Sequence, residues 1–241
     1  MQQRIVVVAG PPAGGKTSVM IHAIGALQAK GQQVAVVKID CLDTEDHHRY
    51  AKLNIPVVAG LSRDVCPDHF FAVNFEEMAE WARERKADLL IIETAGLCHR
   101  CAPATVKTLS ICVIDCLSSV KVPQKIGPVL TTADIIVVAK GDIVSQAERE
   151  VFWHKIKQIN RDAIIMEVNG ITGAGNESLA RLILDAPTVE TVTGDTLRHS
   201  MPTAICSYCV GEIRLGNEYQ QGVVEKMNFA EETEKPVCLV D

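Results

Sequence analysis

The chain has 241 residues, of which 47% are hydrophobic and 22% are charged, and its formal net charge is -6. This length fits one α/β domain or one domain with an appendage, and either can bury a large core. The acidic balance excludes broad nucleic-acid binding through phosphate neutralisation, so any anionic ligand must be held locally.

The nine cysteines are an odd number, and two pairs of them have the spacing CxxC. Because thiols stay reduced inside cells, this usage predicts metal or redox chemistry rather than a disulfide scaffold. The N-terminal MQQRIVVVAG carries one basic residue before a short apolar stretch. No run approaches the roughly 18 apolar residues of a membrane span. We therefore expect a cytoplasmic protein that binds neither membranes nor nucleic acid.

Apolar runs alternate with amphipathic stretches in the rhythm typical of a parallel sheet covered by helices. Apolar runs predict strands over residues 4–10, 33–40, 55–60, 88–93, 111–116, 133–140 and 162–168. Amphipathic stretches predict helices over residues 16–31, 74–86, 145–159 and 176–184. Asn74 is the expected N-cap of the second helix, and Gly31 is the expected terminus of the first.

The strongest motif is GPPAGGKT, which satisfies GxxxxGKT and lies directly between the first predicted strand and the first predicted helix. In such a loop, backbone amides face the phosphates, the lysine reaches the β and γ oxygens, and the threonine hydroxyl ligates Mg²⁺. The alternative is a glycine-rich turn without a ligand. The predicted nucleotide-binding residues here are Gly10, Pro11, Pro12, Ala13, Gly14, Gly15, Lys16, Thr17 and Ser18.

The fold class is therefore α/β, with a mainly parallel central sheet flanked by helices as in P-loop NTPases. Residues 1–185 are predicted to form this P-loop GTPase domain. The rhythm of strands and helices then stops, and residues 186–241 are predicted to form a short cysteine-containing C-terminal extension of short strands and turns.

The segment AKGD, at the end of the sixth predicted strand, helps to predict which nucleotide base the protein binds. P-loop GTPases place Asn/Thr-Lys-x-Asp here; Lys140 and Asp142 are present, whereas Ala139 replaces the polar residue. Asp142 alone still favours guanine, since adenine offers no matching pair of donors and would leave the carboxylate unpaired. The loop NGITGAG, beginning with Asn169 and Gly170, is expected to close over the base. The alternative for KGD is a solvated turn, and the strictness of GTP over ATP stays open.

Residues 4–185 resemble the UreG and HypB nickel-insertion GTPases, which are P-loop NTPases of the SIMIBI class. The resemblance is carried by VIDCLSSVKVPQKIGPVLTTADIIVVAKGDIV from residue 113, KIDCLDTEDHHRYAKLNIPVVAG from residue 38 and DLLIIETAGL from residue 88. It implies a compact GTPase that dimerises when it holds GTP and delivers a metal ion to a client apo-enzyme.

Two carboxylates end predicted strands beside the phosphate loop. Asp40 and Glu93 are predicted to hold Mg²⁺ or its waters together with Thr17, because Mg²⁺ prefers oxygen ligands. The alternative is that either carboxylate only caps the end of its strand.

The loop that follows Asp40 is expected to respond to the γ-phosphate. It carries Asp43 and Asp46, and Asp43 is the predicted residue for positioning the attacking water, with Lys16 as the other catalytic residue. Phosphoryl transfer asks mainly for positioning and charge compensation, so no strong base is demanded.

The predicted transition-metal ligands depart from those of the relatives. The UreG family carries Cys-Pro-His, whereas CPDH here separates Cys66 from His69 by one extra residue. A Cys-x-x-His turn still brings both side chains to one tetrahedral ion. The segment LCHRC adds Cys98 and Cys101, with His99 between them. For each pair, the alternative is a purely structural role.

Cys206 and Cys209 form a possible second site in the extension. One CxxC supplies half of a tetrahedral site, so closure needs Cys238 with another ligand or the same pair from a second subunit. A redox pair or two unpaired thiols are the alternatives. The remaining cysteines are expected to be small buried hydrophobic residues: Cys41, Cys112 and Cys116.

Together these features predict a metal-binding GTPase that hydrolyses GTP to control delivery of a metal ion to a client apo-metalloenzyme or accessory protein. GTP and Mg²⁺ are the expected cofactors, and a homodimer is expected on GTP and metal binding. The ion is Ni²⁺ by the resemblance, but Zn²⁺ stays open because thiolate and imidazole accept both.

The alternative function is a dimeric ATPase that carries a shared iron-sulfur cluster for electron transfer or enzyme activation. Guanine preference with a colourless or nickel-tinted protein indicates the GTPase, and adenine preference with a brown protein indicates the ATPase. A small-molecule P-loop kinase fits AKGD and the cysteine placement less well.

Overall fold

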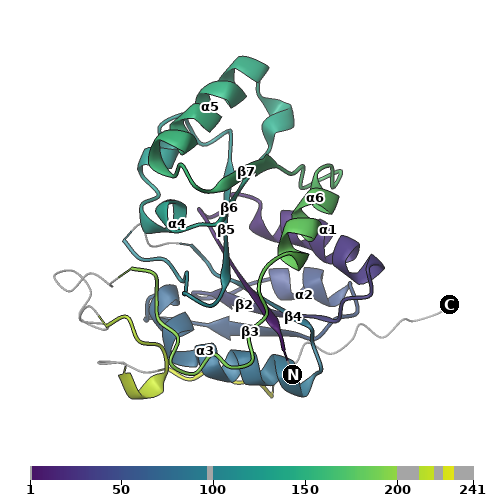
Figure 1. Cartoon of the computed structure of the whole chain (residues 1–241), viewed down its shortest axis with the longest axis vertical. Coiled ribbons are helices and arrows are strands. Elements are labelled where there is room, and N and C mark those ends of the chain that lie inside the picture. Colours follow the sequence, from purple (N-terminus) through teal and green to yellow (C-terminus); the bar gives the residue numbers. More distant parts are fainter. Residues whose placement is uncertain (1, 97–99, 200–211, 220–224, 231–241) are drawn as a thin grey trace.

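Within the described residues, seven parallel strands form one sheet in the order β3-β2-β4-β1-β5-β6-β7 (Figure 1). The computed structural model describes residues 2–96, 100–199, 212–219 and 225–230. The strands are β1 (Arg4–Ala9), β2 (Val34–Asp40), β3 (Val57–Leu61), β4 (Leu89–Glu93), β5 (Leu109–Asp115), β6 (Ile135–Ala139) and β7 (Ile164–Glu167). Every predicted strand and the predicted α/β fold class are confirmed, because runs buried on both faces carry a strong local signal.

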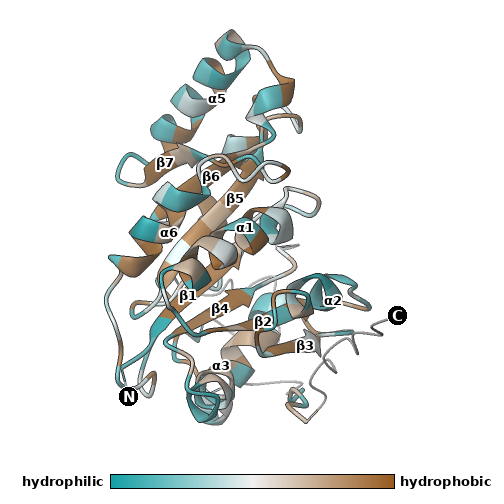
Figure 2. Cartoon of the chain, turned by 90° about the vertical axis from the view of Figure 1, so that its right-hand side faces the viewer, coloured by the Kyte–Doolittle hydropathy of each residue, from teal (hydrophilic) through white to brown (hydrophobic). Residues whose placement is uncertain are grey.

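Helices cover both faces of the sheet (Figure 1). One face is covered by α1 (Lys16–Ala29), α2 (Asp46–Ala51) and α6 (Asn176–Leu184), and the other by α3 (Pro67–Glu84), α4 (Pro128–Thr131) and α5 (Gln146–Ile159). Alternation along β1 explains this: Val6 and Val8 pack in the cluster with α1, whereas Ile5 and Val7 pack with α3. Figure 2 shows the resulting hydrophobic strands between the helix layers.

Three further short helices, all of the 3-10 type, lie in loops: η1 (Val122–Gln124), η2 (Gly141–Ile143) and η3 (Asn217–Tyr219). The predicted helices over 16–31, 145–159 and 176–184 are confirmed as α1, α5 and α6, and Gly31 has the left-handed φ of +80° typical of a helix terminus. The short helices α2 and α4 were not expected. None of the helices in the described part of the chain is both long and apolar enough to cross a membrane.

The start of α3 differs from the prediction, and Asn74 is not an N-cap. The helix begins at Pro67, whose ring favours the first helical position, so Asn74 lies in the helix interior and is fully buried. Its side-chain amide donates to the carbonyls of Phe70 and Glu225, at 2.8 and 2.9 Å, and its oxygen accepts from the Met227 amide. Asn74 therefore joins α3 to the C-terminal extension.

The described parts of the extension pack against the α3 side of the sheet. Antiparallel bridges pair Gln3 with Val189 and Thr105 with Leu197. Val189 packs against the core cluster that contains α3, and Leu197 belongs to it, together with Val192, Leu215 and Met227. The division into residues 1–185 and 186–241 stays a prediction. Cys206 and Cys209 lie outside the described residues, so the second site is a prediction too.

Candidate nucleotide and metal site

The phosphate loop lies at the carboxyl edge of the sheet, between β1 and α1. β4 and β5 pair with β1 on its two sides, and in open parallel sheets ligands bind outside the strand ends where the order reverses in this way. Gly10 has a φ of +143°, and a Cβ there would lie 2.0 Å from the Val113 carbonyl oxygen. The loop therefore packs on β5 in a path that only glycine permits at this position.

Lys16 lies inside this loop. Its ammonium donates to the carbonyl oxygens of Gly10 and Pro11, both at 3.0 Å, and the residue is 6% exposed. Burial lowers the pKa of Lys16, and the negative charge of Glu93 opposes that shift only in part. The side chain thus points into the concavity where P-loop proteins hold phosphates.

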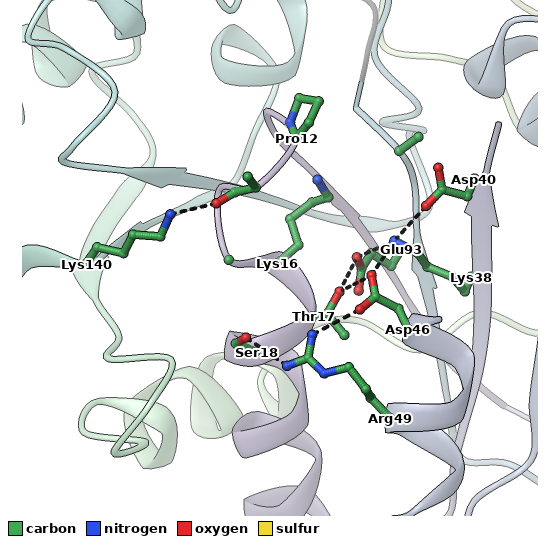
Figure 3. Close-up of a pocket in the computed structure, with 13 residues that line it drawn as sticks. Pro12, Lys16, Thr17, Ser18, Lys38, Asp40, Asp46, Arg49, Glu93 and Lys140 are labelled. Atoms are coloured by element: carbon green, nitrogen blue, oxygen red, sulfur yellow. Dashed lines mark hydrogen bonds and ion pairs between the residues drawn. The ribbon is translucent and has the colours of Figure 1, made fainter. Parts of the chain in front are cut away.

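Thr17 lies in the first turn of α1 and faces two carboxylates (Figure 3). Its Oγ1 lies 2.8 Å from Glu93 Oε1 and 2.9 Å from Asp46 Oδ2. A hydroxyl donates a single hydrogen, so the two carboxylates compete for it. Hydroxyl and carboxylate oxygens are the ligands that Mg²⁺ prefers, and the donor set of Thr17, Glu93 and Asp46 fits that ion.

Asp40 ends β2 and borders the same cavity as Thr17 and Glu93, as predicted. Asp43 does not border it: its carboxylate caps the Thr44 amide at 2.8 Å and lines a neighbouring pocket beside His47 and His48. The role of Asp43 in positioning water stays a prediction without a contact to support it.

Asp46, rather than Asp43, is the loop carboxylate that reaches the threonine. Burial acts to raise the pKa of Asp46, but the hydrogen bond from Thr17 and the charge of Lys38 outweigh it and hold the pKa below its usual range. Arg49, one turn further along α2, donates to Asp46 Oδ1 at 3.0 Å and to Ser18 Oγ at 2.9 Å. These contacts bind α2 to the start of α1.

Lys38 was not anticipated from the sequence. It lies on β2 opposite Glu93 of β4 and is 3% exposed, with its ammonium 2.7 Å from Glu93 and 3.3 Å from Asp46. Burial acts to lower the pKa of Lys38, but Glu93, Asp46 and Asp40 outweigh it and raise the pKa. Tyr50 donates to the other oxygen of Glu93, and burial, followed by the charge of Glu93, raises the Tyr50 pKa well above its usual value.

These side chains surround a cavity of about 410 Å³ (Figure 3). It is lined by Pro12, Ala13, Gly15, Lys16, Thr17, Ser18, Lys38, Asp40, Asp46, Arg49, Glu93, Ala95 and Lys140. Most of the predicted phosphate-loop residues and both predicted strand-end carboxylates are therefore brought together, with Gly10, Pro11 and Gly14 in the same loop.

A second pocket, of about 300 Å³, contains the predicted base-binding residues. Asp142 and Asn169 both line it, with Arg149 and Glu167 beside them. Asn169 Oδ1 accepts from the amides of residues 171 and 172, at 2.8 and 2.9 Å, and thereby holds the loop in shape. The adjacent Gly170 packs on Ser18, where a Cβ would lie 3.0 Å from the serine Cβ.

Lys140 lines the first cavity, and the adjacent Gly141 lines the second pocket. The backbone of Lys140 is left-handed, with a φ of 57°, and its ammonium donates to the Ala13 carbonyl of the phosphate loop at 2.7 Å. Asp115 lies 3.6 Å from the same ammonium. Lys140 thus reaches from the loop after β6 to the phosphate loop.

Of the predicted transition-metal ligands, the structure describes Cys66, His69 and Cys101, and these do not form a metal site. Cys66 is the half-buried N-cap of α3, His69 is buried one turn later, and Cys101 is buried in the apolar cluster with α3. Cys98 lies outside the described residues. Among the residues that are described, no three His, Cys, Asp or Glu side chains are grouped to hold a metal ion. This site therefore stays a prediction.

The backbone nevertheless links the cysteine segment to the phosphate loop. Gly96, directly before that segment, has a φ of +67°, and a Cβ there would lie 1.8 Å from the carbonyl oxygen of Gly10. The two loops are thus in direct backbone contact.

Comparison with known proteins places the chain among related sequences. Residues 4–167 match the family model described as "CobW/HypB/UreG, nucleotide-binding domain". The chain is 51% identical to the uncharacterized protein MJ0120 of Methanocaldococcus jannaschii, over 93% of this chain and 96% of that protein. It is 28% identical to the urease accessory protein UreG of Edwardsiella ictaluri, over 73% of this chain and 91% of that protein.

The fold is similar to that of solved hydrogenase maturation factors. HypB from Archaeoglobus fulgidus gives a TM-score of 0.62 at 20% identity, over 76% of this chain and 89% of that chain. HypB from Helicobacter pylori, solved in complex with nickel, gives 0.60 at 18% identity, over 76% and 86% of the two chains. At these identities the structural likeness concerns the fold alone.

Proposed function

The chain belongs to the CobW/HypB/UreG family of nucleotide-binding domains, and we propose that it is a GTPase that controls delivery of a transition-metal ion to a client metalloenzyme. The observation that carries the proposal is the backbone contact between Gly10 and Gly96. It joins a complete phosphate loop to the segment that contains Cys98 and Cys101, so the state of the nucleotide can act on the metal ligands.

Hydrolysis rests on the residues around Thr17. Lys16 compensates negative charge on the transferred phosphoryl group, and the amides of the loop orient the phosphates. Thr17, Glu93, Asp46 and Asp40 would hold Mg²⁺ directly or through water, which when bound neutralises charge on the β and γ oxygens. Asp43 is the proposed water-positioning residue, and it reaches the phosphates only if its loop moves toward the cavity.

Guanine selection rests on Asp142. Its carboxylate lines the pocket next to Lys140, whose ammonium already contacts the phosphate loop. A carboxylate there accepts from the two guanine donors, and adenine would leave it unpaired. Ala139 contributes no polar group to the base, so Asp142 carries the discrimination.

The proposed cargo is nickel. The HypB structure from Helicobacter pylori holds nickel, and UreG is named for urease, and these likenesses support the same ion here. The proposed ligands, Cys66, His69, Cys98 and Cys101, accept nickel or zinc, so the metal content must be measured.

A homodimer is the proposed active state. Exposed apolar side chains follow four strands at the carboxyl edge of the sheet, beside the nucleotide site: Leu42 (77% exposed), Leu117 (49%), Ile143 (60%) and Ile171 (82%). Apolar residues gathered at one edge favour an interface, and a second copy there would face the phosphates and the cysteine segment. The client is an apo-metalloenzyme or its accessory protein.

The test is anaerobic purification followed by metal analysis and hydrolysis assays with GTP and ATP. We expect faster hydrolysis of GTP, a colourless or nickel-tinted protein, and metal retention that increases with a non-hydrolysable GTP analogue. A brown protein that prefers ATP would instead indicate an ATPase carrying an iron-sulfur cluster.

A further inference from the structure

Lys38 contacts two of the carboxylates that surround the proposed magnesium site. Its ammonium lies 2.7 Å from Glu93 Oε1 and 3.3 Å from Asp46 Oδ2. The Thr17 hydroxyl lies 2.8 and 2.9 Å from the same two oxygen atoms. The ammonium and the hydroxyl thus contact the same pair of carboxylate oxygens.

The strand register explains why this lysine is so close. Lys38 and Glu93 are paired residues on the adjacent strands β2 and β4, so their side chains leave the same face of the sheet. Lys38 precedes the strand-end Asp40 by two residues, which places both side chains on one face, with 3.6 Å between ammonium and carboxylate. The ammonium of Lys38 therefore lies within 3.6 Å of every carboxylate of the cavity.

The charges that line the cavity balance. Its carboxylates are Asp40, Asp46 and Glu93, and its cationic side chains not paired elsewhere are Lys16, Lys38 and Arg49. The fourth lining cation, Lys140, is paired with Asp115 outside the cavity. A balanced cavity offers a divalent cation little net attraction, since each carboxylate is already close to a positive charge.

We propose that the Lys38 ammonium takes the place of a divalent cation in the nucleotide-free protein, so that Mg²⁺ enters only with the nucleotide. The phosphates add negative charge to a neutral cavity and supply oxygen ligands, and both changes favour the ion. The flexible lysine stem lets the ammonium turn away from Glu93 and toward the phosphates. Lys38 is thus a positioning residue that sets the order of binding. The proposal rests on the nucleotide site proposed above but not on its base preference, its cargo or hydrolysis.

The alternative is that Lys38 only stabilises the fold as a buried ion pair. The two roles differ in one measurable property, which is the affinity of the nucleotide-free protein for a divalent cation. Removing a purely structural lysine changes stability alone. Removing a surrogate cation leaves the carboxylates in excess and opens the site to metal.

The experiment titrates nucleotide-free protein with Mn²⁺, which takes oxygen ligands like Mg²⁺ and reports binding by electron paramagnetic resonance. We expect wild type to bind weakly, and at least about tenfold more tightly with a non-hydrolysable GTP analogue. Lys38→Met and Lys38→Gln, which remove the charge, should each bind Mn²⁺ at least about tenfold more tightly than wild type without nucleotide. Lys38→Arg should stay weak, because it keeps the charge.

Lys30→Met is the matched control, since Lys30 pairs with Glu177 on the surface and does not line the cavity; its Mn²⁺ affinity should equal that of wild type. Tight Mn²⁺ binding by nucleotide-free wild type overturns the proposal without any variant. So does equal affinity in wild type and in whichever neutral variant folds. Failure of the GTPase proposal would be seen separately, in the hydrolysis and base-preference assays.

Discussion

A Cβ at position 96 would lie 1.8 Å from the carbonyl oxygen of Gly10, a separation that real Cβ atoms do not adopt. Gly96 has the left-handed φ of +67°, and Gly10 carries the first turn of the phosphate loop. The segment after β4 and the loop after β1 therefore fit together only because Gly96 has no side chain. This backbone contact connects the phosphate loop to Gly96, which comes directly before the segment that contains Cys98 and Cys101 in the sequence.

Gly96→Ala should weaken nucleotide binding by about tenfold or more, because the strain of about 1–3 kcal/mol and the clash must be relieved by displacing Gly10. Fluorescent GTP titration measures this. Gly25→Ala is the control, since nothing lies within 4 Å of a Cβ there and the position is inside helix α1. Unchanged affinity in Gly96→Ala would mean that the two loops move independently.

Lys16→Ala should lower the hydrolysis rate by more than about 100-fold, because it removes the cation that compensates charge on the transferred phosphoryl group. The rate is measured as phosphate release under saturating GTP. Lys125→Ala, an exposed lysine of another loop, should leave the rate unchanged. Residual activity near the wild-type rate would show that another residue carries this charge.

Asp142→Ala should reduce the preference for GTP over ATP at least about tenfold, because the guanine donors lose their carboxylate. Competition between the two nucleotides for the same site gives the ratio directly. Asp162→Ala, at an exposed position before β7, is the matched control. If wild type already binds ATP as tightly as GTP, the role given to Asp142 is wrong.

The sequence alone was sufficient to predict the strands of the sheet and the position of the phosphate loop. Strands such as β1 and β6 are buried on both faces, so each appears as a continuous apolar run, and GxxxxGKT depends on residues that are neighbours in the chain. The start of α3 was missed because its polar residues Asp68 and His69 are buried and the next four residues are apolar, so the segment shows no amphipathic period.

Contacts between segments that are far apart in the chain could not be predicted from the sequence. The charge of Lys38 is compensated by Glu93, 55 residues later, and nothing local distinguishes it from a lysine at the end of a strand. The sequence gives no reason to prefer Asp43 or Asp46 as the carboxylate that reaches the site. Only the short helix that begins at Asp46 directs that carboxylate toward Thr17. From the sequence alone, Asn74 was predicted to be a helix N-cap, because its hydrogen-bond partners lie 151 and 153 residues away in the chain.

Asn74→Ala should lower the free energy of unfolding by about 2 kcal/mol, because the buried amide of Met227 and the carbonyl of Glu225 lose their partner. Chemical denaturation measures this. Glu77→Ala, which removes an exposed ion pair with Lys226 in the same seam, should change the value by about 0.5 kcal/mol or less. Equal effects of the two variants would show that the extension does not depend on Asn74.

The double variant Cys98→Ala with Cys101→Ala should lose both the bound transition metal and the GTP-dependent dimer, while the monomer still binds nucleotide. If Cys98 and Cys101 bind the ion at a dimer interface, two copies of the chain can supply four cysteine ligands. The metal content should then approach about one ion per two chains. Metal and a non-hydrolysable GTP analogue must then strengthen each other's binding, by reciprocal linkage. Because the ligands are thiolates, metal uptake should release protons and weaken as pH falls.

Cys112→Ala is the control for that variant. Burial raises the pKa of Cys112 to about 12, so it stays a protonated thiol within β5 and its loss should affect stability but not metal content. Metal analysis and light scattering, with and without the GTP analogue, give both readouts on the same samples. Cys101 is buried in the cluster with α3, so thermal unfolding is followed in parallel to separate lost packing from a lost ligand. A folded double variant that keeps its metal and its dimer would assign the two cysteines to packing, and the nickel site would have to be sought elsewhere in the chain.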